Sequence, residues 1–218
     1  MKRMKTLGMA MALLALGACS PQKNASDKTT EQTTEQQADT NNNQVVETIM
    51  ARRSIRKYKP QPVEENKLQQ IIECGINAPN GRHLESWEVR ILNTPELMEE
   101  LNKSYRAYQK KMSKKRESHP SFGAPTLIFI AYNKEYDLSQ VDCGLLGGNM
   151  ILTAQSLGLG TCCLGGLARY LESADGADML KRLDLPETHQ LLYAIALGYP
   201  DEQPNAKSRD FGKVKWVK

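Results

Sequence analysis

The sequence predicts one domain of mixed helices and strands behind a non-globular N-terminal segment. Apolar residues recur at helical spacing in some segments, whereas residues 126–132 and 191–197 form short continuous apolar runs typical of buried strands. No Gly-x-Gly-x-x-Gly sequence follows a first strand, which argues against a Rossmann domain. The length of 218 residues accommodates one ordinary domain with additional segments.

Residues 1–18 have the features of a bacterial secretion signal. Three basic residues lie within the first five, and residues 7–16 form an apolar run too short to span a bilayer comfortably as a permanent helix. The run ends in Leu-Gly-Ala followed by Cys19, which resembles a lipobox. This resemblance implies cleavage before Cys19 and lipid attachment to its sulfur. An ordinary signal with a chance cysteine and a single membrane anchor are the alternatives.

Residues 19–43 are predicted to be a disordered tether. They are almost entirely Ser, Thr, Gln, Asn, Asp, Glu and Lys, and such a segment cannot bury enough apolar surface to offset its ordering entropy. The expected location is therefore the cell envelope, with the domain of residues 44–218 lipid-anchored to a bacterial membrane and facing the periplasm or the surface.

The first half of the domain is predicted to contain three helices and one strand. Residues 44–52 form a short amphipathic helix, and a second helix carries four apolar residues on one face. It ends at the breaker sequence of residues 77–81, and residues 87–92 alternate as a strand. Thr94-Pro95-Glu96 then has the pattern of an N-cap, an N1 proline and an acidic first turn. The apolar face of the second helix consists of Leu68, Ile71, Ile72 and Ile76.

The second half is predicted to pack around one long helix. Residues 138–157 are apolar nearly all round and include Gly144, Gly147 and Gly148. Glycine costs a helix about 1 kcal/mol relative to alanine, so three glycines indicate that another backbone packs very close. A helix that is apolar on every side must be central or covered by a second subunit. The other predicted elements are strands over 126–132, 161–164 and 191–197, two short helices within 167–182, and an edge strand over 213–217.

Two basic clusters near opposite ends of the domain are candidate phosphate-binding groups. One comprises Arg52, Arg53, Ser54 and Arg56, and the other is Lys207-Ser208-Arg209. Arginine matches phosphate oxygens with two parallel hydrogen bonds, and a serine hydroxyl adds a donor. Basic runs are more often solvated surface, so the clusters share one phosphate only if the fold brings them together.

Cysteine spacing and net charge give little functional information. None of the five cysteines forms a CxxC pair, so no metal site is expected. Cys74, Cys143, Cys162 and Cys163 are interpreted mainly as small buried apolar residues rather than a disulfide framework. The net charge of +4 is mild and by itself indicates neither nucleic acid nor membrane.

From about residue 45 to 217, the chain resembles the nitroreductase-like flavoprotein family. No single motif is decisive, but their order and spacing together are specific. The motifs are Arg52-Arg53-Ser54-Ile55-Arg56, Ala78 to Trp87, Asp142-Cys143-Gly144, Gly158-Leu159-Gly160-Thr161, Leu197-Gly198-Tyr199-Pro200 and Lys207-Ser208-Arg209.

The resemblance implies an α+β fold, with a mixed central sheet flanked by helices, in a domain-interlocked homodimer whose two subunits build each site for FMN. Arg52, Arg53, Ser54 and Arg56 would hold the phosphate and the pyrimidine edge, and Lys207 and Arg209 would close on the phosphate. Asn80, Gly81 and His83 would meet the flavin from the partner subunit. The backbone of Leu164, Gly165 and Gly166 would lie near its reactive face.

The implied activity is an FMN-dependent oxidoreductase in which a donor and a small oxidised acceptor, such as a nitro compound or quinone, use one site in turn. No protein nucleophile is required, so no catalytic residue is assigned, and no nucleic-acid partner is expected. The usual donor, NAD(P)H, is cytoplasmic, which conflicts with the secretion signal. Alternatives are a non-catalytic flavin-binding lipoprotein and, because His83 and Glu85 depart from the common pattern, a dehalogenase-like branch.

Overall fold

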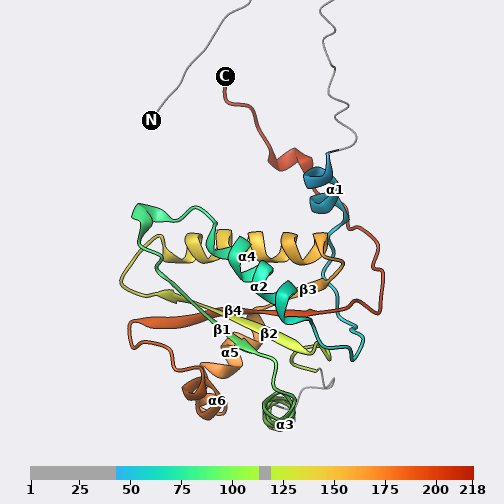
Figure 1. Ribbon diagram of the computed structural model, residues 1–218. Coiled ribbons are helices and arrows are strands. Elements are labelled where there is room, and N and C mark those ends of the chain that lie inside the picture. Colours follow the sequence, from blue (N-terminus) through green and yellow to red (C-terminus); the bar gives the residue numbers. More distant parts are fainter. Residues whose placement is uncertain (1–42, 113–118) are drawn as a thin grey trace, which may run out of the picture. The chain divides into compact units, whose positions relative to one another are not determined.

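Four antiparallel strands pair in the order β1-β2-β4-β3 and form the central sheet (Figure 1). The computed structural model describes residues 43–112 and 119–218, so the predicted secretion signal, Cys19 and the tether up to residue 42 lie outside the described residues. The strands are β1 (Trp87–Leu92), β2 (Thr126–Asn133), β3 (Gly160–Leu164) and β4 (His189–Gly198). The helices are α1 (Gln44–Ala51), α2 (Glu65–Ile76), α3 (Pro95–Lys111), α4 (Ser139–Ser156), α5 (Gly165–Leu171) and α6 (Ala177–Arg182), with 3-10 turns η2 (Gly81–His83) and η3 (Phe211–Lys213).

Helices cover both faces of this sheet, which accounts for the continuous apolar strands. Helices α2 and α4 lie on one face, and α3, α5 and α6 lie on the other (Figure 1). Along β2, Leu127 and Phe129 point into the core beneath α3 and α5, whereas Ile128 and Ile130 point into the core beneath α2 and α4. The two faces of one strand therefore supply two separate apolar cores.

A parallel neighbour adds to the antiparallel sheet at its β3 edge. Ser54 forms an isolated parallel bridge with Thr161 of β3, and the Ile55 N–H donates to the Thr161 carbonyl at 2.9 Å. The chain that follows α1 therefore runs along the sheet edge, which gives the sheet its mixed character.

Most predicted elements are confirmed to within a few residues. The predicted strand 87–92 coincides with β1, and the predicted helix 138–157 contains α4. The expected N-cap residue Thr94 does precede α3, but its side chain makes no capping hydrogen bond.

Two sequence-based expectations are wrong. The predicted edge strand over residues 213–217 does not form, because the tail lies away from the described sheet edges (Figure 1), and Phe211 and Trp216 are 78% and 81% exposed. Cys163 is exposed rather than buried, because successive residues of β3 face opposite sides and its neighbour Cys162 takes the buried side. The four described cysteines are free thiols.

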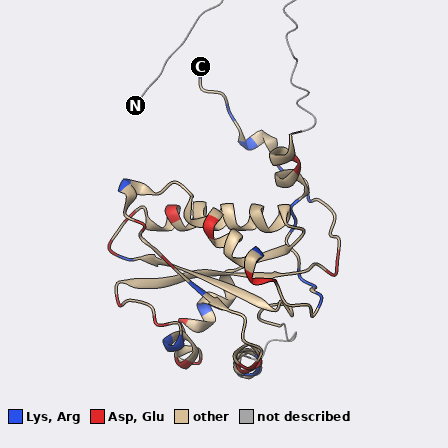
Figure 2. Ribbon diagram, in the orientation of Figure 1, with Lys and Arg blue, Asp and Glu red and all other residues tan. Residues whose placement is uncertain are grey.

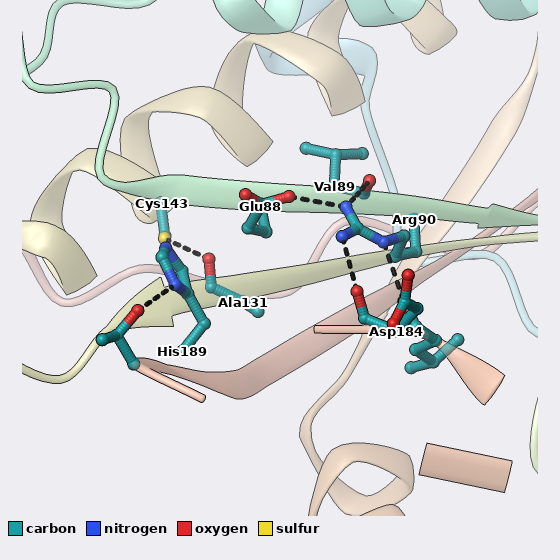
Figure 3. Close-up of polar contacts among 9 residues, drawn as sticks. Glu88, Val89, Arg90, Ala131, Cys143, Asp184 and His189 are labelled. Carbon is teal, nitrogen blue, oxygen red and sulfur yellow. Dashed lines mark hydrogen bonds and ion pairs between the residues drawn. The ribbon is translucent and has the colours of Figure 1, made fainter. Parts of the chain in front are cut away.

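Arg90 of β1 ties the sheet to the chain that leaves α6 (Figure 3). Its Nε donates to the Leu183 carbonyl at 2.8 Å and its Nη2 to the Asp184 carbonyl at 2.9 Å. Its Nη1 also pairs with Glu88 at 2.6 Å.

Figure 3 also shows the Cys143 thiol of α4 directed at the Ala131 carbonyl of β2, at 3.5 Å. Burial raises the pKa of Cys143 to about 12, so this thiol stays protonated and serves packing.

His119 provides a pH-dependent contribution to stability. Its Nδ1 accepts the Gly123 N–H at 3.1 Å, and its pKa is lowered mainly by burial and secondarily by Arg106. Because this pKa is lowered in the folded state, the unfolded chain binds a proton at His119 near the ordinary histidine pKa of about 6.5, whereas the folded chain binds it only at lower pH. The free energy of unfolding therefore falls as the pH is lowered through that range. We expect His119→Asn to lose less unfolding free energy than the wild type between about pH 7.5 and pH 5, measured by urea denaturation. Equal losses would contradict this assignment.

Candidate functional site

A cavity of about 450 Å³ lies where the chain after α1 meets the chain near the C-terminus. Its size suits a small-molecule or cofactor site. The lining residues come from α1, the segment after it, α4 and the late chain, and they are Ile49, Met50, Arg52, Arg53, Ser54, Arg56, Leu152, Pro204, Asn205, Ala206, Lys207 and Arg209. The two basic clusters, which are about 150 residues apart in sequence, therefore face one cavity.

Backbone pairing along the sheet edge explains how the clusters meet. The Ser54–Thr161 bridge holds the first cluster beside β3. Tyr58 then bridges Pro200, which follows β4, and the Asp201 N–H donates to the Lys57 carbonyl at 2.9 Å. The chain beyond Pro200 consequently leaves the sheet alongside the first cluster.

The cavity wall carries five cations and, among the described lining residues, no carboxylate. None of the five forms an ion pair with another described residue. Instead, Arg53 donates to the Met50 carbonyl at 2.6 Å, and Arg209 donates to the Lys207 carbonyl at 3.0 Å. Figure 2 marks Lys and Arg positions in blue along the segment that follows α1 and on the C-terminal segment. Unpaired positive charge that converges on a cavity favours an anionic ligand.

Most of the remaining cavity wall is apolar. Ile49 and Met50 of α1 and Leu152 of α4 line it. A phosphate monoester attached to a largely uncharged body matches this division, because charged and apolar parts of the ligand each meet a suitable wall. The Ser54 hydroxyl can add a donor to the phosphate.

Leu164, Gly165 and Gly166 lie at the junction of β3 and α5, outside the cavity lining. Both glycines are exposed, and a Cβ built on either would meet no other part of the described chain within 4 Å. Their backbone is therefore accessible from outside the chain. The nearby Cys162 thiol is buried, which raises its pKa despite opposing effects of Arg56 and Arg52, so it provides no thiolate nucleophile.

Asn80, Gly81 and His83 lie in the loop between α2 and β1, and they also do not line the cavity. The Gly81 N–H donates to Asp142, in the first turns of α4, whereas Leu152 of the cavity lies ten residues further along the same helix. At 1.5 Å per residue, these two positions are about 15 Å apart along the helix axis. Within one chain, the expected flavin contacts thus fall into separate groups.

Sequence reasoning missed the uncharged part of the cavity wall. Pro204, Asn205, Ala206 and Leu152 carry no recognisable motif. The amphipathic pattern of α1 was visible, and the helix buries none of its own residues against the described chain, so its apolar side was available for a cavity wall.

Among residues 43–112 and 119–218, no cluster of His, Cys, Asp or Glu has the arrangement of a metal site, and no helix has the length and apolar character needed to cross a membrane.

Comparison with known proteins links this geometry to flavoproteins. The family model described as "Nitroreductase family" matches residues 49–199. An NADPH-flavin oxidoreductase from Vibrio harveyi is 31% identical over 183 residues, which cover 77% of this chain and 70% of that protein. The crystal structure of a Bacteroides fragilis nitroreductase with bound FMN is 28% identical, with a TM-score of 0.73 over 81% of this chain and 100% of the other. An FMN-bound nitroreductase from Desulfitobacterium hafniense is 26% identical, with a TM-score of 0.72 over 81% and 99% of the two chains.

Proposed function

Because the chain belongs to the nitroreductase family, we propose that it is an FMN-dependent oxidoreductase whose cationic cavity holds the FMN phosphate. One observation carries the proposal. Five cationic side chains from opposite ends of the domain surround a single cavity, and none of them forms an ion pair with a carboxylate among the described residues. Two relatives of the same fold were crystallised with FMN, a ligand with a phosphate at one end.

The chain's own residues supply binding and electrostatics. Arg52, Arg53, Arg56, Lys207 and Arg209 are proposed to bind the phosphate, together with the Ser54 hydroxyl, while Ile49, Met50 and Leu152 exclude water from the uncharged part. When bound, FMN supplies the redox chemistry, in which a reduced donor and then a small oxidised acceptor, such as a nitro compound or quinone, use one site in turn. The positive field of the cavity favours an electron-rich ligand.

We also propose that the active unit is a homodimer in which two copies of α4 pack together. The outer side of α4 presents Val141 (57% exposed), Gly144, Leu145 (43% exposed) and Gly148, called here the α4 stripe. Among the described residues, nothing outside the adjoining turns of α4 lies within 4 Å of a Cβ built at Gly144 or Gly148, so contacts within the described monomer do not explain either glycine.

A twofold arrangement would also reunite the separated flavin contacts. If two α4 helices cross antiparallel near residues 144–148, the Asp142 end of one lies beside the Leu152 end of the other. The loop carrying Asn80, Gly81 and His83 is attached at the first end, and the cavity lies at the second. Each flavin would then contact both subunits, with the backbone of Leu164, Gly165 and Gly166 accessible to its ring.

The visible spectrum of the purified protein tests the enzyme proposal. We expect a yellow flavin band, and anaerobic addition of NADPH or NADH should bleach it. The absence of the band, even after FMN is added, would contradict the proposal. A band that no physiological reductant bleaches would support the second candidate, a flavin-binding lipoprotein, which the predicted N-terminal secretion signal favours because NAD(P)H is cytoplasmic. Dehalogenation by the reduced protein would instead support a dehalogenase-like activity.

Membrane attachment is proposed through a lipid on Cys19, from the Leu-Gly-Ala-Cys sequence at residues 16–19. We expect Cys19→Ser to abolish incorporation of a labelled fatty acid and to shift the protein out of the lipid-anchored membrane fraction. Cys163→Ser, which changes an exposed thiol of the folded domain, should leave labelling intact. Equal labelling of the wild-type and Cys19→Ser proteins would contradict the anchor.

A further inference from the structure

The only charged side chain of α4, Asp142, is buried against the loop of residues 80–86. It is 3% exposed, and both of its carboxylate oxygens are used. Oδ1 accepts the Gly81 N–H at 2.9 Å, and Oδ2 accepts the Ser86 hydroxyl at 3.2 Å. A buried carboxylate is costly unless such bonds compensate it. Asp142 therefore fixes the loop at both of its ends.

The loop between these two contacts has a strained backbone. Arg82, His83 and Glu85 have φ values of 54°, 55° and 45°, in the left-handed region that residues other than glycine seldom adopt. Such conformations persist only where the surrounding structure enforces them, and they cluster at functional sites.

Apolar packing does not enforce this conformation, because residues 82–85 are all exposed. Polar contacts remain. Asn80 accepts the Glu85 N–H at 3.0 Å across the loop, and the hydroxyl of Ser139, also in the first turn of α4, donates to the Ser86 carbonyl at 2.6 Å. Gly81 fits against Tyr136, whose hydroxyl would collide with any side chain at that position. Asp142 is the one charged group among these contacts, and it is the member that binds both ends.

We propose that Asp142 is a positioning residue, which holds the strained loop of residues 80–86 in the shape that contacts the flavin of the other subunit. This inference rests on the proposed function and extends it. A loop that is strained, exposed and anchored by a buried carboxylate is preorganised for a partner outside its own chain. Asp142 acts through Gly81 and Ser86 and need not touch the flavin itself.

Two measurements on Asp142→Ala test the inference. In the apoprotein, release of the loop should free the Arg82–His83 segment from its fixed conformation, so trypsin should cut after Arg82 at least about tenfold faster. Mass spectrometry of the resulting fragment measures this cleavage. In titrations with FMN, the dissociation constant should rise on the order of tenfold, because the flavin must then order the loop. Asp142→Asn, which keeps an oxygen for Gly81, should give intermediate values.

Glu172→Ala is the matched control. The Glu172 carboxylate also accepts a backbone N–H, that of Leu191 at 2.9 Å, but it lies after α5, which packs on the opposite face of the sheet. It should lower thermal stability without faster cleavage at Arg82 and without weaker FMN binding. Wild-type FMN affinity in Asp142→Ala, with or without faster cleavage, would overturn the positioning role, as would equal effects in Glu172→Ala. If wild-type protein binds no FMN, the proposed function itself fails.

Discussion

An Arg52→Ala/Arg209→Ala variant is expected to purify almost free of FMN, whereas each single variant should retain part of it. Both side chains line the cavity from opposite ends of the domain, and neither has an ion-pair partner among the described residues. Hydrogen bonds to charged groups contribute about 1.5–3 kcal/mol each, so each arginine should change the dissociation constant roughly tenfold to more than a hundredfold. Fluorescence titration of the apoproteins with FMN measures this change.

Riboflavin, which lacks the phosphate, separates loss of phosphate contacts from general damage to the site. The wild type should bind FMN more tightly than riboflavin, and the double variant should bind the two with similar affinity. Arg182→Ala removes an arginine that pairs with Glu100 on the surface at 2.8 Å, and it should preserve the preference. If the double variant still prefers FMN as strongly as the wild type, the cavity does not hold the phosphate.

Local sequence patterns predicted the elements well because burial and periodicity determine them. Residues 126–132 and 191–197 are apolar on both sides, and the corresponding strands β2 and β4 occupy the centre of a sheet covered on both faces. The C-terminal tail was mispredicted because the prediction relied on the same kind of local pattern. Its alternating pattern resembles an edge strand, but within the described chain nothing lies beside it to pair with, and alternation alone does not supply a partner.

The site was predictable as charge clusters but not as a cavity. Arg52 and Arg209 could be named from the sequence, whereas their convergence depends on the bridges of Ser54 to Thr161 and of Tyr58 to Pro200, which are long-range pairings. Asp142 was visible only as part of a family motif. Its role follows from the left-handed residues of the loop that it anchors, and backbone strain of that kind has no signature in the residue types Arg82, His83 and Glu85.

The glycines of α4 differ in whether a contact within the monomer requires them. A side chain at Gly147 would collide with the hydroxyl of Tyr193, which itself donates to the Cys143 carbonyl at 2.8 Å, so this glycine is required within the monomer. Within the part of the chain that the structure describes, Gly144 and Gly148 face open space. As alanine is a better helix former than glycine by about 1 kcal/mol, a monomer would have no reason to keep them.

Gly144→Leu and Gly148→Leu should therefore each convert the dimer to monomers and weaken FMN binding, while leaving the monomer folded. Overpacking a tight contact costs about 1–3 kcal/mol, and a twofold interface includes each substitution twice, so the dimer should lose roughly 2–6 kcal/mol. Sedimentation equilibrium gives the dissociation constant of the dimer. Lys103→Leu on α3, across the sheet from α4, adds the same side chain to an exposed helix and should leave the dimer intact. Wild-type association in both glycine variants would exclude the α4 stripe as the interface and would leave the loop of residues 80–86 without a flavin to contact.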